Sequence, residues 1–209
     1  MLNLYSEENA LRVLEKNAAQ IESICRECAL PQAYLKSVLM MELTRMDVLD
    51  PVADAVVAVN WLGSPLLRPA LETRSPLQKL DSSTGPGQIY SRVAIQAIRF
   101  TRSRGISTAA VRDLRPELSE DDPDDLRLVW KRLRHDTVFN LSCAALNLIH
   151  CAWQMTGRID FEGYTPQETK LIFTRYNADV KHVTAYGEAA YAWYLRFSKE
   201  ALIKSKCAD

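Results

Sequence analysis

The segment from residue 136 to residue 157, DTVFNLSCAALNLIHCAWQMTG, constrains the fold of this chain more than any other. It has helical periodicity and is the most hydrophobic of the helical segments, with apolar residues on nearly every side of the predicted helix. Such a helix is stable in water only when other helices cover it. Because no segment alternates apolar and polar residues over the length of a strand, we predict an all-α (mainly α) fold around this central helix.

The remaining helices are predicted from periodicity and end signals. Ser6 is expected to cap the first helix, and Pro31 to open the second at a position where proline is tolerated. Residues 52–63 are apolar enough for a buried helix or, less favoured, a short strand. The proline-rich segment 64–87 is predicted to be mostly loop, with one helical turn around residues 71–75. The other predicted helices are 6–28, 31–50, 91–105, 107–114, 124–134, 165–179 and 184–202, and an acidic loop connects 118–125.

Chain length and charge limit the kinds of function that this protein is expected to have. The 209 residues are expected to form a single domain, 1–209, and the 26 basic residues equal the 26 acidic ones, so no overall field favours nucleic acid or an anionic membrane. No stretch resembles a signal peptide or a membrane span. We therefore expect no nucleic-acid partner and no membrane span, and a protein that is cytoplasmic as synthesised.

The cysteines do not indicate a disulfide framework. Their number, five, is odd, and we expect them to be reduced. Cys25 and Cys28 have the spacing of half a zinc site, but no second pair follows and His135, His150 and His182 are scattered. We read the pair as small apolar residues on a helix, and we expect no metal and no cofactor.

Glu42 stands out because it lies on the apolar side of a predicted helix. An ionised carboxylate is costly to desolvate, so a Glu here must be paired, protonated or placed at a cleft. A cleft with apolar walls favours the protonated form and suits a general acid near neutral pH. The alternative is a structural ion pair, for example with Arg92 or Arg99. The surrounding apolar arc consists of Tyr34, Leu35, Val38, Leu39, Met41, Leu43 and Met46, and the opposite side carries Lys36, Ser37, Thr44 and Asp47.

A second unusual stretch, DSSTGPGQIY, occupies residues 81–90. Gly85 and Gly87 permit backbone conformations and close ligand approach that side chains would block, and Pro86 stiffens the turn. Gln88 supplies an amide donor and an acceptor, which suit sugar hydroxyls. Each property also fits an ordinary helix-entry turn.

Taken in order, these pieces form a pattern. VLMMEL around Glu42, SSTGPGQI at 82–89, FNLSCAALNL around Asn140 and RYNAD around Tyr176 follow one another in helical context. The pattern resembles the lysozyme-like superfamily, specifically the goose-type lysozymes and soluble lytic transglycosylases (glycoside hydrolase family 23-like). The resemblance covers residues 31–194, with 1–30 as a leading helix, and implies a lysozyme-like helical domain with a substrate cleft.

The resemblance implies a role for each matching residue. Glu42 would protonate the glycosidic oxygen between N-acetylmuramic acid and N-acetylglucosamine in peptidoglycan. The backbone from Gly85 to Gly87, with Gln88 and Ile89, would grip the sugar beside the scissile bond. Tyr176 would approach the carboxylate or the sugar, Asn177 would fix the helix end, and Asn140 would be a structural hydrogen-bonding residue.

The sequence departs from the family at several positions. Leu43 stands where the family usually has Ser, and Pro86 replaces a more usual apolar residue. Ala178 and Asp179 stand where Ala or Gly, and then Gly, are commonest. An inverting hydrolase needs a second carboxylate roughly 6.5 to 9.5 Å away, for which Asp81 is the first candidate. The further candidates are Asp47, Asp50 and Asp54. A lytic transglycosylase needs only the single Glu, and the sequence leaves both routes open.

The expected partners are peptidoglycan glycan strands and an immunity or inhibitor protein. The protein would then act at the cell wall or periplasm, delivered by phage lysis or a secretion system. A non-catalytic alternative is a lysozyme-like scaffold that binds glycan or a protein partner, with Glu42 buried in an ion pair. A nucleic-acid binder would use the basic helix face, against the neutral charge balance. That face carries Arg92, Arg99, Arg102 and Arg104.

Overall fold

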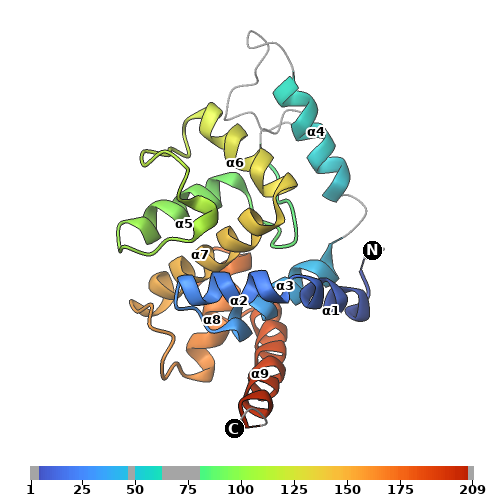
Figure 1. Cartoon of the computed structure of the whole chain (residues 1–209), viewed down its shortest axis with the longest axis vertical. Coiled ribbons are helices and arrows are strands. Elements are labelled where there is room, and N and C mark those ends of the chain that lie inside the picture. The colour runs from blue at the N-terminus through green and yellow to red at the C-terminus, as the bar shows by residue number, and fades with distance from the viewer. Residues whose placement is uncertain (1–4, 47–49, 63–80, 207–209) are drawn as a thin grey trace.

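The computed structural model describes residues 5–46, 50–62 and 81–206, and this part of the chain is mainly helical with no strand (Figure 1). The predicted all-α class is confirmed. The α-helices are α1 (Glu7–Lys16), α2 (Ala18–Glu27), α3 (Gln32–Arg45), α4 (Asp50–Leu62), α5 (Ser91–Arg102), α6 (Pro123–His135), α7 (Thr137–Thr156), α8 (Pro166–Asn177) and α9 (Ala185–Lys206).

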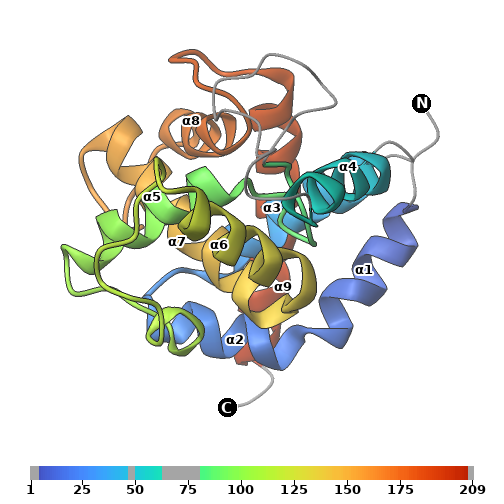
Figure 2. The same cartoon turned by 90° about the horizontal axis from the view of Figure 1, so that it is seen from above.

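Helix α7 lies at the centre of the helical assembly, as its sequence predicts (Figure 2). Every residue from Phe139 to Ile149 is buried, and helices α2, α3, α5, α6 and α8 all pack against it. Asp136 caps the helix by accepting the N–H of Phe139 at 2.9 Å, and Gly157 ends it in the left-handed conformation. Burial on every side explains why its sequence is apolar on every face.

Helix α3 is also more buried than its pattern predicts. Tyr34 is 1% exposed and packs against Phe161, Phe173 and Tyr194, with ring centroids 4.8, 5.5 and 4.8 Å away. Ser37, predicted on the polar side, is fully buried, and its hydroxyl donates to the carbonyl of Ala33 at 2.6 Å. This aromatic contact joins α3 to α8 and α9.

Two predicted helices differ in the structure. The predicted helix 6–28 is divided into α1 and α2 at Asn17, whose side chain competes with its own backbone N–H for the carbonyl of Val13, at 2.8 and 3.2 Å. Residues 107–114 form only a short 3-10 turn, Ala109–Val111. Residues 52–62 of the ambiguous segment lie in helix α4, whereas residue 63 and the part 64–80 of the predicted loop, with its turn at 71–75, lie outside the described residues.

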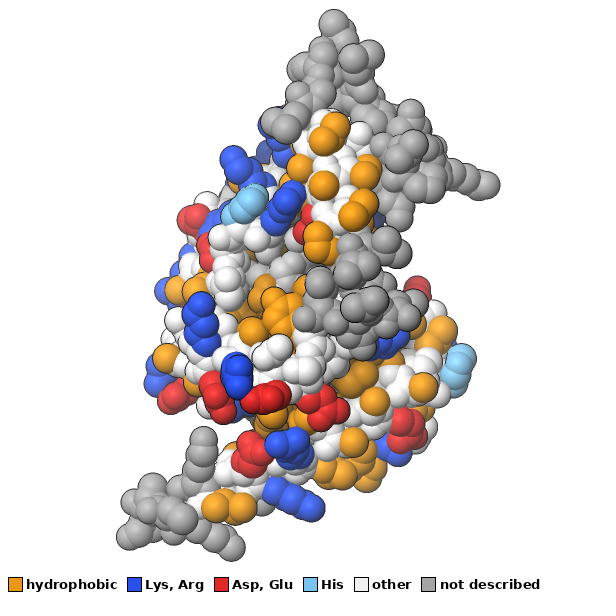
Figure 3. All heavy atoms as spheres, turned by 90° about the vertical axis from the view of Figure 1, so that its right-hand side faces the viewer, with side chains coloured by type: hydrophobic (Ala, Val, Ile, Leu, Met, Phe, Trp, Pro, Cys, Tyr) orange, Lys and Arg blue, Asp and Glu red, His pale blue; other side chains and the backbone are white. Residues whose placement is uncertain are grey.

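Helix α4 presents apolar side chains to solvent, visible as a band along its outer face in Figure 3. Val52 and Val59 are 56% and 66% exposed, whereas Val57 and Trp61 face inward and are buried. No helix in the described part of the chain is long and apolar enough to cross a membrane.

Cys25 and Cys28 are buried between α2 and the rest of the core. Burial raises the pKa of the Cys25 thiol to about 12 and that of Cys28 to about 11. Both thiols are therefore protonated near neutral pH, as expected for cysteines buried among apolar side chains.

The α8–α9 contact at Gly187 generates a stability prediction. A Cβ at this position would lie 2.2 Å from Thr174 Oγ1 and 2.5 Å from the carbonyl oxygen of Lys170. Alanine is normally favoured over glycine in a helix by about 1 kcal/mol. We expect Gly187→Ala instead to lower the free energy of unfolding by about 1–3 kcal/mol, because α9 must shift away from α8. Urea denaturation measures this.

Ala189→Gly, an exposed change on the same helix, is the control and should cost about 1 kcal/mol through helix propensity alone. A Gly187→Ala protein as stable as the wild type would show that the two helices are less tightly opposed than described.

Candidate active site

The segment from Asp81 to Tyr90 forms a tight turn beside the central helix. Thr84 and Ile89 pair through their backbones, with N–H to carbonyl distances of 3.2 and 3.3 Å. Gly85 has a φ of +69°, and a Cβ there would lie 2.3 Å from Nδ2 of Asn140. Glycine is therefore required at 85 both for the backbone conformation and for the space.

Asn140, fully buried in α7, holds this turn. Its Oδ1 accepts the N–H of Gly87 at 2.7 Å, and its Nδ2 donates to the carbonyl oxygens of Thr84 at 2.8 Å and Leu133 at 3.2 Å. One carboxamide thus satisfies buried backbone groups of the turn and of α6, which is the structural role the sequence predicts for Asn140.

Side chains from neighbouring helices fix the beginning of the segment. Asp54 of α4 accepts the hydroxyls of Ser82 and Thr84, both at 2.7 Å, and Trp130 of α6 donates to Ser82 Oγ at 2.9 Å. Asp81 accepts the backbone N–H groups of Ser91 at 2.9 Å and Arg92 at 3.1 Å, at the start of α5. Burial raises the pKa of the Asp81 carboxyl, and these N–H groups oppose the rise. The turn is therefore anchored on several helices.

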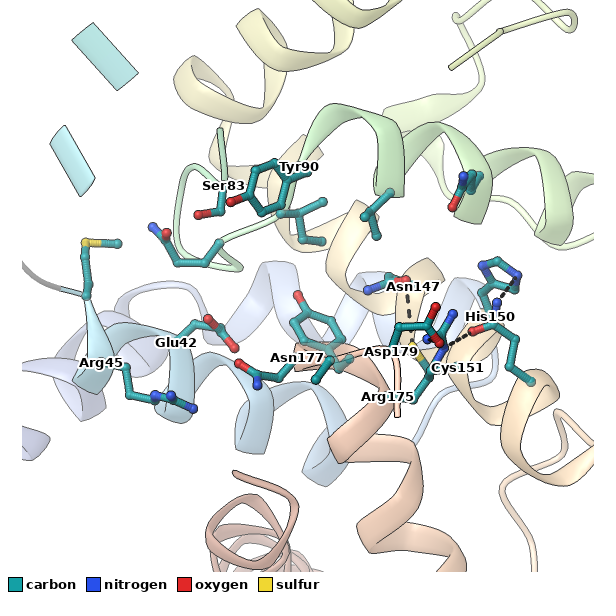
Figure 4. Close-up of a pocket in the computed structure, with 18 residues that line it drawn as sticks. Glu42, Arg45, Ser83, Tyr90, Asn147, His150, Cys151, Arg175, Asn177 and Asp179 are labelled. Carbon is teal, nitrogen blue, oxygen red and sulfur yellow. Dashed lines mark hydrogen bonds and ion pairs between the residues drawn. The ribbon is translucent and has the colours of Figure 1, made fainter. Parts of the chain in front are cut away.

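A cleft of about 490 Å³ opens between this turn and the C-terminal ends of α3 and α8 (Figure 4). Its lining comes from α3, the 81–90 segment, α5, α7 and the end of α8. The residues that line it are Glu42, Arg45, Met46, Ser83, Gln88, Ile89, Tyr90, Val93, Gln96, Asn147, His150, Cys151, Gln154, Arg175, Tyr176, Asn177, Ala178 and Asp179.

Glu42 is partly exposed at one end of this cleft. Its Oε1 accepts the hydroxyl of the buried Tyr186 of α9 at 2.5 Å. The guanidinium of Arg45 lies 5.2 Å from the centre of the Tyr186 ring. Burial, and then the charge of Glu42, raise the pKa of Tyr186 well above its ordinary value, so its hydroxyl remains a donor to the carboxylate.

Tyr176 connects the carboxylate end of the cleft to the glycine turn. Its hydroxyl donates to the carbonyl of Gly87 at 2.8 Å. Burial, and then the charge of Glu42, raise its pKa as well. Asn177, the last residue of α8, is exposed, and Figure 4 shows its amide turned toward the carboxylate of Glu42. The end of α8 thus supplies two polar side chains to the same cleft as Glu42.

The structure brings most of the sequence-predicted site residues together. Glu42, Gln88, Ile89, Tyr176 and Asn177 line one cleft, and Gly85 and Gly87 form the turn behind it. The Nε2 of Gln88 is bonded to the carbonyl of Gly85 at 3.1 Å. The side-chain amide of Gln88, which the sequence analysis predicts to bind the sugar, therefore also stabilises the turn.

The two predicted second carboxylates that the structure describes, Asp81 and Asp54, are not among the residues that line the cleft. Asp81 caps α5 and does not line the cleft, and Asp54 holds the two hydroxyls of the turn. Asp47 and the side chain of Asp50 lie outside the described part of the chain. Arg99, proposed as an ion-pair partner of Glu42, instead pairs with Glu120 at 2.6 Å.

Sequence reasoning missed Tyr186, Arg45 and the α7 wall of the cleft. Tyr186 belongs to a run of aromatic residues at helical spacing on α9, and nothing local separates it from Tyr191 or Tyr194, which pack in the core. Asn147 lies within the central helix α7, where the one local sign of a role is an amide among apolar residues.

No cluster of three or more His, Cys, Asp or Glu side chains with metal-binding placement occurs within residues 5–46, 50–62 and 81–206. The chemistry of the cleft is that of a carboxylate flanked by tyrosines, amides and an arginine. Comparison with known proteins gives no match among family models, curated proteins or solved structures.

The Asn140 contacts predict the cost of removing that carboxamide. Asn140→Leu leaves the buried N–H of Gly87 and the carbonyl of Thr84 without this partner. We expect a loss of about 2–5 kcal/mol in the free energy of unfolding, measured by urea denaturation, together with faster hydrogen exchange at Gly87.

Asn177→Leu is the matched control, because Asn177 is exposed and should change stability by no more than about 0.5 kcal/mol. Equal stability of the two variants would refute the role given to Asn140.

Proposed function

We propose that this protein cleaves the glycan strands of peptidoglycan, at the linkage between N-acetylmuramic acid and N-acetylglucosamine, with Glu42 as the general acid. The observation that carries the proposal is the position of Glu42, partly exposed in a cleft beside Gln88 and Tyr176 and hydrogen-bonded by Tyr186. A purely structural carboxylate has no need of an open cleft. The order of the motifs that resemble the lysozyme-like superfamily supports the same function.

The geometry supports a mechanism in two steps. The protonated Glu42 gives its proton to the glycosidic oxygen as the bond from that oxygen to C1 breaks. The resulting carboxylate then accepts the proton of the 6-hydroxyl of the muramic acid, whose oxygen bonds to C1 and yields a 1,6-anhydro end. Tyr186 holds the carboxylate in place between the steps, and Arg45 offers a positive charge to the lactyl carboxylate of the sugar.

The carboxylates of the cleft favour this transglycosylase route over hydrolysis. Among the described residues, Glu42 and Asp179 are the carboxylates that line the cleft, and Asp179 is paired with Arg175. Asp81 and Asp54 have their oxygens engaged elsewhere. A route that needs one carboxylate therefore suits the described residues better than an inverting hydrolysis, which needs two.

Glu42→Gln tests the general acid. The amide keeps the shape of the side chain but carries no transferable proton, so we expect the release of soluble muropeptides from purified peptidoglycan to fall about 10³-fold. Mass spectrometry of the wild-type products should show anhydro ends, lighter by one water than hydrolysed ends.

Glu15→Gln on the exposed face of α1 is the control and should leave the rate unchanged. A folded wild-type protein that releases no muropeptides from several wall types across a broad pH range would contradict the enzyme proposal. It would favour the alternative of a non-catalytic scaffold that binds glycan or a protein partner.

Tyr186→Phe tests the hydrogen bond to the acid. Removing the donor favours the protonated form of Glu42, so the alkaline limb of the activity–pH profile should move to higher pH. We expect kcat to fall about tenfold with KM nearly constant, because the carboxyl loses a positioning contact made at the reacting group.

Tyr191→Phe, on the same helix but away from Glu42, should change neither quantity. If Tyr186→Phe left both kcat and the pH profile unchanged, the hydrogen bond would have no part in catalysis.

A further inference from the structure

Helix α4 is apolar on two opposite sides, and the described residues cover the inner one. Val57 and Trp61 face inward and are buried, whereas Val52 and Val59 are more than half exposed. A helix that is apolar all round is normally covered all round, as the central helix α7 is. The outward side of α4 is therefore a candidate docking surface.

The exposed side chains of α4 have the spacing of a helix–helix contact. The outer face of α4 consists of Val52, Ala55, Val56 and Val59, and its apolar side chains form the band seen in Figure 3. At about 100° per residue, the positions i, i+3, i+4 and i+7 form the stripe that one helix presents to another. The small side chain of Ala55, at the middle of the stripe, lets a second helix approach closely.

The charges of α4 decide which partner fits this face. Residues 50–62 include no lysine or arginine, so the helix offers nothing to the anionic headgroups of a membrane. Asp50 stands at the first position of the helix, beyond the stripe, and Asp54 lies on the inner side. Two outer faces therefore meet without like-charge repulsion. Because the chain has 26 basic and 26 acidic residues, two whole copies also carry no net charge that keeps them apart.

We propose that the outer face of α4 binds the outer face of α4 in a second copy of this chain, with the two helices antiparallel about a two-fold axis. The contact is then isologous, and Val52 of one copy packs against Val59 of the partner subunit. The antiparallel arrangement also places opposite ends of the two helix dipoles together. The inference does not depend on the proposed function.

The size of the face sets the strength of the contact. Helix α4 has 13 residues, and a helix of that length is about 20 Å long and about 10 Å wide. Two such faces bury less than the roughly 1,200–2,000 Å² of a stable protein interface. We therefore expect a weak dimer that forms and dissociates with protein concentration.

The inner side of the same helix supports the wall of the cleft. Asp54 accepts the hydroxyls of Ser82 and Thr84, both at 2.7 Å, and its backbone carbonyl accepts the guanidinium of Arg134 at 3.2 Å. A partner on the outer face restricts local opening of α4, and with it local opening of the 81–90 turn. The dimer thus acts on the cleft without adding a residue to it.

Sedimentation velocity of the full chain tests the proposal, at protein concentrations from about 1 µM to about 1 mM. We expect the mass to rise from one chain toward two, with a dissociation constant on the order of 100 µM. Val59→Lys should weaken association about 100-fold, because each dimer loses two buried valines and would have to desolvate two ammonium groups. Val59 is exposed in the monomer, so the variant should fold, as circular dichroism checks.

Leu195→Lys is the matched control. Leu195 is an exposed aliphatic residue of α9, which lies at the opposite end of the molecule from α4 (Figure 1). The variant adds the same charge and should associate as the wild type does. Equal loss of association in Leu195→Lys and Val59→Lys would show non-specific self-association and overturn the proposal.

Two further results would overturn the second copy as the occupant. A wild-type protein that stays monomeric but sediments with vesicles of phosphatidylcholine and phosphatidylglycerol would assign the face to a lipid surface. A protein that stays monomeric, and in which Val59→Lys lowers the free energy of unfolding, would show that the same chain covers the face.

Hydrogen exchange at the turn tests the link to the cleft. The backbone N–H groups of Thr84 and Ile89 bond each other's carbonyls across the turn. We expect their exchange to slow about fivefold between the lowest and highest concentrations in the wild type, and not in Val59→Lys. A mass that doubles while this exchange stays constant would overturn the link to the turn. Muropeptide release, measured separately on Glu42→Gln, decides the proposed function and is independent of these results.

Discussion

The cleft depends on one carboxamide, that of Asn140. It is fully buried in the central helix, yet it faces backbone groups of a turn that no helix or sheet satisfies. Unpaired, those groups would each cost about 1–3 kcal/mol, so the turn takes the one conformation in which the carboxamide reaches them. That conformation brings Gly85 so close to Asn140 that no side chain fits at 85. The turn around Gly85 and Gly87 and the side chain of Asn140 therefore depend on each other, although more than fifty residues of sequence separate them.

The rigid turn fixes one wall of the cleft, and two tyrosines link the turn and Glu42 to the C-terminal half of the chain. Tyr176 bonds the carbonyl of Gly87 and Tyr186 bonds Glu42, so the turn and the carboxylate are each held from the C-terminal half of the chain. Both hydroxyls lie near the charge of Glu42 and keep their protons, because burial and that charge raise their pKa values. Under the proposed function, a carboxylate held in this way would be preorganised for proton transfer.

The close packing of α8 against α9 serves the same site. Gly187 lets the backbone of α9 approach Thr174 and Lys170 of α8, and its neighbour Tyr186 is thereby brought under α3. The helix pair thus carries Tyr176 and Asn177 on one member and Tyr186 on the other. Stability at this contact and geometry at Glu42 are consequently linked, although Gly187 itself touches no part of the cleft.

The sequence by itself determined the helical class, the central place of α7 and the unusual position of Glu42, because these follow from local periodicity and from the cost of burying charge. It also marked Gly85, Gln88 and Tyr176 through short motifs. It also named Asp81 as a second carboxylate, and in the structure Asp81 accepts backbone N–H groups at the start of α5, so its catalytic role stays a prediction. Tyr186, Arg45 and Asn147 came only from the tertiary structure. Their neighbours in sequence are ordinary helical residues, and which face of α7 or α9 meets the cleft is decided by packing between helices far apart in the chain.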